Sequence, residues 1–310
     1  MSDVFRVVQP GILTTVQDVG RPQAVAAGVP PGGAMDRFAH VAANLLVDND
    51  GSPATLECTL VGPKLVAARK CVIAITGADL QPTINGSEAP MWTSVALAAG
   101  DQLAFGPRRR GARAYIGVAG GVTGDRWLGS ASTNLMCARG GMHGRALIAG
   151  DVIEAVEPWE QPPPGRTLAG EHRPAYDDHT LRLVRGPHFP RLTAESQHAL
   201  WDATFRLNPS SNRMGYRLDG ARLDAPGEEL LSFSLVAGVI QLPAGGQPIL
   251  MMADHQTAGG YPVIATVTSA SMPVAAQLAP GDELRLVETS IEDALKARAA
   301  QRAALDSLIS

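Results

Sequence analysis

The stretch Gly11-Ile-Leu-Thr-Thr-Val-Gln-Asp18-Val-Gly20-Arg21, continued by Gly28-Val-Pro-Pro-Gly32-Gly33-Ala-Met-Asp36, decides how the first part of this chain can fold. Glycine visits positive φ without strain, and proline fixes φ and lacks an amide donor, so no regular strand can continue past Val19. We therefore predict an ordered loop. It carries an amide, two carboxylates and a guanidinium that together suit a small polar ligand: Gln17, Asp18, Asp36 and Arg21.

A purely structural role is the alternative for these side chains. In turn-rich connections, Asx side chains often cap their own backbone. Asp36 also suits the N-cap of a helix that follows it. For Asp36 the sequence leaves both interpretations open.

The composition is that of an ordinary globular protein. The chain has 310 residues, 45% of them apolar, and a net charge of -4, which allows one large or two medium domains. Positive charge is clustered only at Arg108-Arg109-Arg110, which is more typical of a solvated turn than of a nucleic-acid groove. We therefore expect no nucleic-acid partner.

The cysteines and the apolar segments indicate in which cellular compartment the protein is expected. Cys58, Cys71 and Cys137 have no CxxC spacing, which favours a reducing environment. The first residues lack a signal-peptide pattern, and no apolar span is long enough to cross a membrane. We expect a cytoplasmic protein that does not contact a membrane.

Many short apolar segments bounded by Gly, Asp and Pro predict a mainly β fold. Helices are expected at residues 36–47, capped by Asp36, at about 193–204, and at 290–310, capped by Ser290. A Gly-Asp turn leads into an alternating strand at three places, which suggests repeated barrel-like units: Gly100-Asp101, Gly150-Asp151 and Gly281-Asp282.

A Pro-rich segment over residues 157–165 has no periodicity and predicts an extended connection between two domains. The expected division is an N-terminal barrel-like domain at 1–157, a linker at 158–174, a C-terminal barrel at 175–289 and a C-terminal helix at 290–310.

Two loops of the second half carry further candidates. If the segment around Gly215 is a strand, Arg213 and Arg217 share a face and suit a carboxylate or phosphate. The alternative is that each pairs with a structural acid, such as Asp219 or Asp224. The next loop places neutral donors and acceptors beside glycines that a ligand can approach closely: Gln256, Thr257, Gly259, Gly260 and Tyr261.

Several common signatures are absent from the sequence. There is no P-loop, no G-x-G-x-x-G after a strand, no G-x-S-x-G elbow and no H-E-x-x-H. The histidines lack ligand spacing, so we expect no metal site. His255 lies in a Gly-rich polar loop and is a candidate catalytic base. Residues 140–145 suit either an anion-binding loop with Arg145 or a tight hairpin.

The motifs together resemble the biotin-dependent carboxyltransferase family, whose members include the C subunit of 5-oxoprolinase (KipA), allophanate hydrolase subunit 2 and the carboxyltransferase domain of urea carboxylase. The resemblance extends from about Val7 to about Leu286. It rests on Thr14-Thr15-Val16-Gln17-Asp18-x-Gly20-Arg21, Gly28-Val29-Pro30-x-x-Gly33-Ala34-Met35-Asp36, Leu56-Glu57-x-Thr59-Leu60-x-Gly62-Pro63, Thr76-Gly77-Ala78-Asp79, Val118-Ala119-Gly120-Gly121, Arg213-Met214-Gly215-Tyr216-Arg217-Leu218 and Gln256-Thr257-x-Gly259-Gly260-Tyr261-Pro262.

The resemblance implies tandem cyclophilin-like β-barrel domains and two partners. One partner is the B subunit, which is KipI-like or allophanate hydrolase subunit 1-like, and the other is the A subunit, which is of the LamB/YcsF type. It further implies ATP-dependent cleavage of 5-oxo-L-proline to L-glutamate, with ATP bound here or by a partner. The alternatives are carboxyl transfer to urea or an amide, and a KipA-type regulator that binds a kinase inhibitor. This chain has no Met-Lys-Met biotin attachment site.

Both reactions act on a poorly electrophilic amide or urea carbonyl, which must be polarised while protons are managed. For 5-oxoproline cleavage we expect Arg213 or Arg217 to bind the substrate carboxylate or a phosphate. Asp18 or Asp36 is expected to transfer a proton. The remaining candidates are expected to bind and orient the substrate: Gln17, Arg21, Tyr216, Gln256, Thr257, Gly259, Gly260 and Tyr261.

Overall fold

The fold is that of a computed structural model, which describes residues 2–156, 158 and 160–309. The chain divides into two compact units. The first comprises Met1–Arg21, Gly32–Pro174 and Gln301–Ser310, and the second comprises Pro22–Pro31 and Ala175–Ala300. Glu157 and Trp159 of the Pro-rich segment lie outside the described residues, as does Ser310. The four-part division predicted from the sequence stays a prediction.

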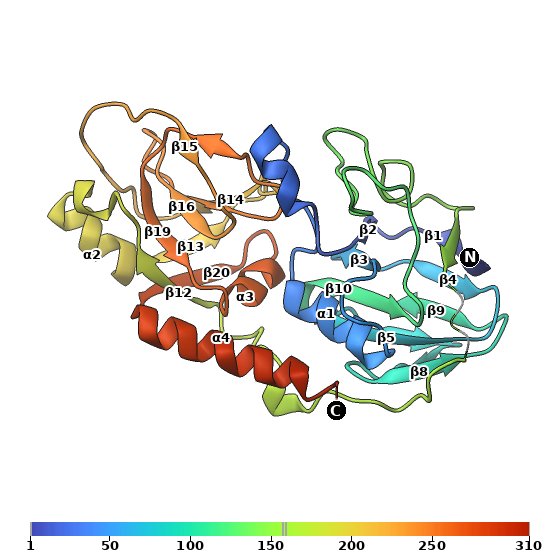
Figure 1. The fold of residues 1–310 in the computed structure, drawn as a ribbon. Helices are drawn as coiled ribbons and strands as arrows, with labels where there is room; N and C mark the ends of the chain where they lie inside the picture. The colour runs from blue at the N-terminus through green and yellow to red at the C-terminus, as the bar shows by residue number, and fades with distance from the viewer. Residues whose placement is uncertain (1, 157, 159, 310) are drawn as a thin grey trace. The chain divides into compact units, whose positions relative to one another are not determined.

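The first unit contains a six-stranded antiparallel sheet (Figure 1). In spatial order its strands are β11 (Val152–Ala155), β1 (Ser2–Gln9), β4 (Lys64–Ala67), β9 (Gln102–Phe105), β6 (Pro82–Ile84) and β7 (Ser87–Glu88). Alternation along β1 and β4 buries Phe5, Val7 and Leu65, and these side chains join the hydrophobic core of this unit.

A second antiparallel sheet of the first unit has five strands. Their order is β2 (Leu13–Gln17), β3 (Thr55–Thr59), β10 (Arg110–Val118), β5 (Cys71–Asp79) and β8 (Ser94–Leu97). One face is apolar and belongs to the core, with Val16, Leu56 and Ile116 fully buried. Because side chains alternate along a strand, the neighbouring residues face the other way.

That opposite face carries a polar row under helix α1 (Arg37–Leu46). The strand register places Thr15 opposite Glu57, Glu57 opposite Tyr115, and Tyr115 opposite Thr76. Helix α1 lies against β10 and β5 in Figure 1, and Thr76 Oγ1 donates to the carbonyl of Ala39 in this helix at 2.7 Å. The polar row is therefore enclosed between helix and sheet.

The predicted helix after Asp36 is confirmed. Asp36 is its N-cap, with Oδ1 accepting from the amide of Ala39 at 2.9 Å. The spacing predicted an apolar stripe of Phe38, Val41, Ala42 and Leu45. Phe38, Ala42 and Leu45 are buried, whereas Val41 is only half-buried.

Gly117 of β10 sets how closely α1 approaches the sheet. A Cβ at this position would lie 2.5 Å from the Ala43 carbonyl oxygen, which is backbone and cannot rotate away. Gly117→Ala should therefore lower the free energy of unfolding by about 1–3 kcal/mol, measured by chemical denaturation. Gly170→Ala is the control, because a Cβ there meets nothing within 4 Å. Equal stability of the two variants would contradict this packing.

The three predicted Gly-Asp turns share one geometry. The glycines have φ of 91°, 91° and 89° at positions 100, 150 and 281. In each turn the aspartate carboxylate accepts from an amide three residues earlier: Asp101 from Ala98 at 2.7 Å, Asp151 from Ile148 at 2.9 Å, and Asp282 from Ala279 at 2.9 Å. A strand follows each turn, so the sequence repeat reports a repeated local structure.

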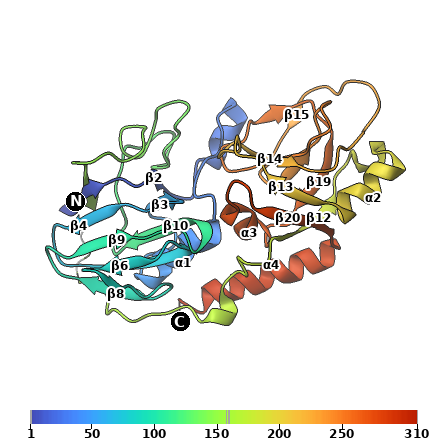
Figure 2. The same ribbon diagram turned by 180° about the vertical axis from the view of Figure 1, so that it is seen from behind.

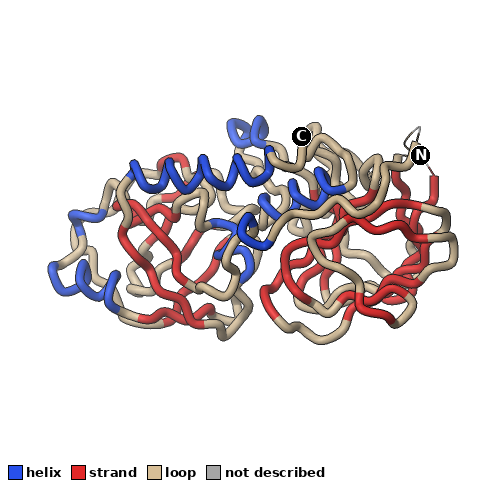
Figure 3. The backbone as a smooth tube through the Cα atoms, turned by 90° about the horizontal axis from the view of Figure 1, so that it is seen from below, coloured by secondary structure: helices blue, strands red, loops and turns tan. Residues whose placement is uncertain are grey.

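The second unit is built on a closed barrel (Figure 2), whose strands are drawn in red on the left of Figure 3. In order they are β12 (Thr180–Arg185), β19 (Val263–Val267), β16 (Val239–Gln241), β17 (Ile249–Met251), β14 (Gly215–Asp219), β13 (Thr204–Leu207) and β20 (Glu283–Glu288). Strands β12 and β20 pair in parallel, and the other pairs are antiparallel. Alternate residues such as Leu183, Phe205 and Leu286 are fully buried.

The remaining elements are a small sheet, three α-helices and three 3-10 turns. A two-stranded sheet pairs β15 (Phe233–Ser234) with β18 (Ala258–Gly259). The helices are α2 (Ala194–Asp202), α3 (Met272–Gln277) and α4 (Ile291–Asp306), with 3-10 turns η1 (Pro22–Ala27), η2 (Gly170–His172) and η3 (Phe189–Arg191). Thr193 caps α2, and Ser290 Oγ accepts from the amide of Asp293 at 3.0 Å at the start of α4.

The predicted mainly β class is confirmed, with a closed barrel, few helices and a C-terminal helix. Within the described ranges, no helix has the length and apolar character needed to cross a membrane.

Candidate functional site

In the first unit, the carboxylate of Asp18 is the centre of a hydrogen-bond cluster. It accepts from the amide of Gly20 at 2.8 Å, the hydroxyls of Ser130 and Ser132 at 2.6 Å each, and the amide of Ala131 at 2.7 Å. The Asp18 amide also donates to Ser132 Oγ at 2.9 Å. This one side chain thereby fixes a segment that lies more than 110 residues further along the chain.

The cluster favours the charged form of Asp18. Burial is the largest single influence and by itself raises the pKa of this carboxyl. The bonds from Ser130, Ser132, Gly20 and Ala131 together outweigh it, so the pKa lies below the ordinary value of 3.8. Asp18 is thus a buried carboxylate at neutral pH.

Arg21 and Gln17 bind the same remote segment. The Arg21 guanidinium donates to the carbonyls of Trp127 and Ser132, and it lies 4.9 Å from the centroid of the Trp127 ring. Gln17 Nε2 donates to the carbonyl of Thr133 at 3.2 Å. Both side chains are fully buried. Three of the residues predicted to hold a ligand therefore hold the loop at 127–133 in this structure.

The turn before α1 packs against the Asp18 segment through backbone atoms. The Ala34 amide donates to the carbonyl of Asp18 at 2.9 Å. Gly33 has φ of 92°, and a Cβ there would lie 2.9 Å from the amide nitrogen of Gly20, so only glycine suits this contact. Asp18 and Arg21 thus lie in one cluster of the first unit, and the turn that leads to Asp36 packs on its backbone.

His40 is a buried histidine next to this cluster, and sequence reasoning did not select it. Its Nδ1 lies 2.9 Å from Thr55 Oγ1, and its Nε2 has no hydrogen-bond partner among the described residues. Burial lowers its pKa from 6.5 to about 4, although the carboxylates of Asp18 and Glu57 act in the opposite direction. The ring is neutral at pH 7.

This low pKa predicts a pH-dependent stability. The unfolded chain protonates His40 near pH 6.5, whereas the folded chain does so only near pH 4. The stability that the neutral His40 ring contributes is fully present above pH 6.5, and it is lost as the pH falls toward 4. Between pH 7 and pH 5, wild type should lose about 2 kcal/mol more unfolding free energy than His40→Gln. Urea denaturation at both pH values measures this difference, and equal losses in the two proteins would contradict it. The pKa of His255 is also lowered, but His255 is present in wild type and in His40→Gln, so its effect cancels in the comparison.

In the second unit, Arg213 pairs with a carboxylate that the sequence analysis did not propose. Its Nε and Nη2 donate to the two oxygens of Asp254 at 2.8 and 3.3 Å, and both side chains are only 9% exposed. The Asp254 amide also donates to the carbonyl of Arg213 at 2.8 Å. Asp254 thus takes the structural role that was expected of Asp219 or Asp224.

The expectation that Arg213 and Arg217 share a strand face is wrong. Strand β14 begins only at Gly215, so Arg213 precedes it and has no strand alternation. Arg213 is buried, whereas the side chain of Arg217 is exposed. Tyr216, which lies between them in the sequence, is 2% exposed.

The segment from Gln256 to Tyr261 forms a second polar cluster. Gln256 Nε2 donates to Gln241 Oε1 at 3.5 Å, and Gln241 Nε2 donates to the Tyr261 carbonyl at 3.3 Å. A Cβ at Gly259 would lie 2.7 Å from Gln256 Nε2, so this glycine makes room for the amide. Thr257 is half-buried, and its carbonyl accepts from the Leu235 amide at 2.9 Å.

Two of the predicted binding residues line a cavity. Gly260 and Tyr261 border a pocket of about 200 Å³, whose charged residues are Arg191, Asp224, Glu228 and Glu229. Tyr261 is 49% exposed, so its ring is accessible to a ligand.

His255 is 2% exposed. Its Nδ1 donates to the carbonyl of Gln256 at 2.7 Å, which leaves Nε2 as the basic nitrogen of the neutral ring. Burial lowers the pKa of His255, against the opposing effects of this carbonyl and of Asp254.

The glycine-rich loop at 140–145 is a tight turn. The amide of Gly144 donates to the Gly140 carbonyl at 2.7 Å, and Met142 and Arg145 form an isolated bridge. The Arg145 guanidinium makes a bidentate ion pair with Asp151 at 2.7 and 2.8 Å. Of the two alternatives, the structure has the hairpin.

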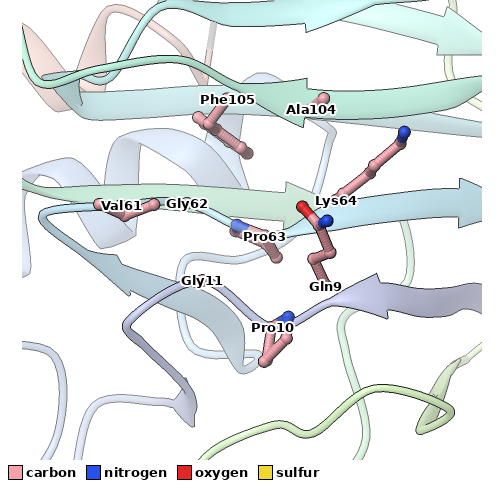
Figure 4. Close-up of a pocket in the computed structure, with 9 residues that line it drawn as sticks. All are labelled: Gln9, Pro10, Gly11, Val61, Gly62, Pro63, Lys64, Ala104 and Phe105. Carbon is pink, nitrogen blue, oxygen red and sulfur yellow. The ribbon is translucent and has the colours of Figure 1, made fainter.

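A separate surface pocket of about 400 Å³ lies in the first unit (Figure 4). Gln9 and Lys64 extend from neighbouring strands at its rim, and the Phe105 ring packs over Gly62, where a Cβ would lie 2.4 Å away. It contains none of the predicted site residues. No group of three or more His, Cys, Asp or Glu able to hold a metal occurs among the residues that the structure describes.

Sequence reasoning missed several members of these clusters. Glu57 appeared only inside a family motif, and Tyr115 was not selected from the sequence. A polar residue in an otherwise apolar strand is the signal that could have selected both, because a buried charge needs a partner. Ser130 and Ser132 carry no comparable signal in the sequence.

Comparisons with known proteins identify the class to which this mainly β architecture and its clusters belong. The family model of the carboxyltransferase domain, subdomain A and B, matches residues 27–288. The chain belongs to this carboxyltransferase family, as its motifs indicated.

The relatives include enzymes of two kinds. The chain is 36% identical to the C subunit of 5-oxoprolinase from Escherichia coli (strain K12) over 308 residues, covering 98% of this chain and 97% of that protein. It is 31% identical to the corresponding C subunit from Haemophilus influenzae, covering 95% and 94%. The crystal structure of the K. lactis urea amidolyase is similar with a TM-score of 0.92 and 28% identity, over 99% of this chain and 20% of that chain.

Proposed function

We propose that this chain is a subunit of an ATP-dependent 5-oxoprolinase, which adds water across the ring amide of 5-oxo-L-proline to give L-glutamate. The observation that carries the proposal is the 36% identity to the E. coli C subunit over almost the full length of both chains. A relative that matches end to end supports a shared role better than one that shares a single domain of a longer protein.

We propose separate roles for individual residues on the basis of their exposure and contacts. Arg217 and Tyr261 have exposed side chains, and Gln256 is exposed as well, so we assign contact with the substrate to these three. The guanidinium of Arg217 suits a carboxylate, and the amide of Gln256 suits the lactam. Arg213 is paired with Asp254, and the carboxylate of Asp18 accepts from four protein donors, so both act by positioning the segments around them.

We place ATP on a partner protein. The loop at 140–145 is the glycine-rich segment that suggested an anion site, and its Arg145 is bound by Asp151. A guanidinium already in a bidentate carboxylate pair is not available to a phosphate. The two partners we propose are a KipI-like protein and a LamB/YcsF-like protein. They supply the nucleotide site and the remainder of the reaction.

An omission experiment tests the proposal. This chain is mixed with the KipI-like and LamB/YcsF-like partners, ATP and 5-oxo-L-proline, and L-glutamate is measured with and without the chain. Glutamate release that requires the chain supports the proposal. A complex that assembles but releases no glutamate contradicts it and favours a regulator that acts through binding alone.

Carboxyl transfer to urea or an amide is the second candidate. The observation in its favour is the TM-score of 0.92 to the urea amidolyase structure. It requires a biotin carrier supplied by another chain. Transfer of labelled bicarbonate to urea in the presence of a biotinylated carrier and its carboxylase tests this candidate.

A further inference from the structure

Two buried side chains of the five-stranded sheet accept hydrogen bonds from the main-chain amides of Met35 and Asp36. The Met35 amide donates to Glu57 Oε2 at 2.9 Å, and the Asp36 amide donates to the Tyr115 hydroxyl at 2.8 Å. The Tyr115 hydroxyl in turn donates to Glu57 Oε2 at 2.7 Å. Two consecutive amides are thus bound by one connected pair.

We propose that Glu57 and Tyr115 are positioning residues that fix the turn at Met35-Asp36 and, through it, the candidate site around Asp18. The turn cannot move independently of that site, because the Ala34 amide donates to the Asp18 carbonyl and Gly33 packs on the Gly20 backbone. A shift at Met35 is therefore transmitted to the Asp18 segment.

Glu57 is 1% exposed and Tyr115 is fully buried, so these side chains have almost no contact with solvent. Apolar residues of similar volume would leave the Met35 and Asp36 amides without their acceptors, which is unfavourable for buried donors. What apolar residues cannot do is bind two amides in one fixed conformation, and a shift of about 1 Å at a catalytic site costs about a hundredfold in rate.

The pair also explains why Asp36 begins the helix at this point. Its amide is bound by Tyr115, its carboxylate caps Ala39, and the helix then crosses the sheet above the polar row. Thr76, in the same row, contacts the helix at the Ala39 carbonyl and not at the turn. Thr76 therefore provides a matched control.

Hydrogen exchange of the peptide covering residues 33–38 tests the positioning role in the isolated chain. Tyr115→Phe keeps the ring and removes the hydroxyl, and should raise exchange of the Met35 and Asp36 amides about tenfold or more. Glu57→Gln keeps an acceptor oxygen and should retain most of the protection. Thr76→Val should leave this peptide unchanged. Wild-type protection in Tyr115→Phe would overturn the proposal.

Kinetics of the reconstituted complex test the link to the reaction, which rests on the proposed function. Tyr115→Phe should lower kcat about tenfold, with KM changed less than threefold. The single variant Glu57→Gln should retain most of the wild-type kcat. A loosened turn with wild-type kcat would overturn the link. If the wild-type complex releases no glutamate, the proposed function fails, and the exchange result still decides the positioning role.

Discussion

Asp18→Ala is expected to lower the free energy of unfolding of this chain by about 3–5 kcal/mol. The substitution removes a buried carboxylate that accepts from two hydroxyls and two amides. Three of these donors, all except the Gly20 amide, lie in the segment at 127–133, which Arg21 and Gln17 also bind. Without the carboxylate, the hydroxyls of Ser130 and Ser132 and the Ala131 amide lose their acceptor.

Chemical denaturation measures the loss, and limited proteolysis localises it. Cleavage within residues 127–134 should become faster in Asp18→Ala. Asp50→Ala is the control, because Asp50 accepts from the amide and hydroxyl of Ser52 in an exposed turn, where the loss should be much smaller. Similar losses in the two variants, or unchanged proteolysis, would show that Asp18 does not hold this segment.

Arg213→Ala is the second large effect that we expect, with a loss of about 3–5 kcal/mol. It leaves the Asp254 carboxylate buried without the guanidinium that binds both of its oxygens. Arg213→Lys keeps the charge but not the planar fork, so it should be clearly destabilised as well.

A double-mutant cycle separates the pair from the individual side chains. Arg213→Met with Asp254→Leu removes both charges and should be more stable than either single substitution, because no buried charge is left alone. The exposed pair of Arg206 and Glu283 is the control, and Arg206→Ala there should cost less than about 1 kcal/mol. Additive losses at positions 213 and 254 would contradict a coupled buried pair.

Local signals in the sequence predicted much of the fold. The cap at Asp36, the stripe of α1 and the Gly-Asp turns depend on residues within four positions of one another. Such local interactions can therefore be predicted from the sequence. The closed barrel follows less directly, because strands can be predicted one at a time but their pairing is set by contacts far apart in sequence.

The candidate site was predictable as a set of residues but not as a set of contacts. Asp18, Arg21 and Gln17 were selected as ligand-binding groups, and each binds the loop at 127–133, which no local pattern connects to them. Glu57 and Tyr115 meet only because β3 and β10 pair in one particular register. A shift of one residue in this pairing would place the two side chains on opposite faces of the sheet.

Product formation from two substrates tests the central claim most directly. The complex of this chain with its KipI-like and LamB/YcsF-like partners is given ATP and either 5-oxo-L-proline, or urea with bicarbonate, a biotinylated carrier and its carboxylase. L-glutamate and the urea-dependent consumption of bicarbonate are measured in parallel. An oxoprolinase subunit predicts glutamate from 5-oxo-L-proline, lost when this chain is omitted, and no consumption of bicarbonate with urea. Glutamate formation that is unchanged without this chain would contradict the account.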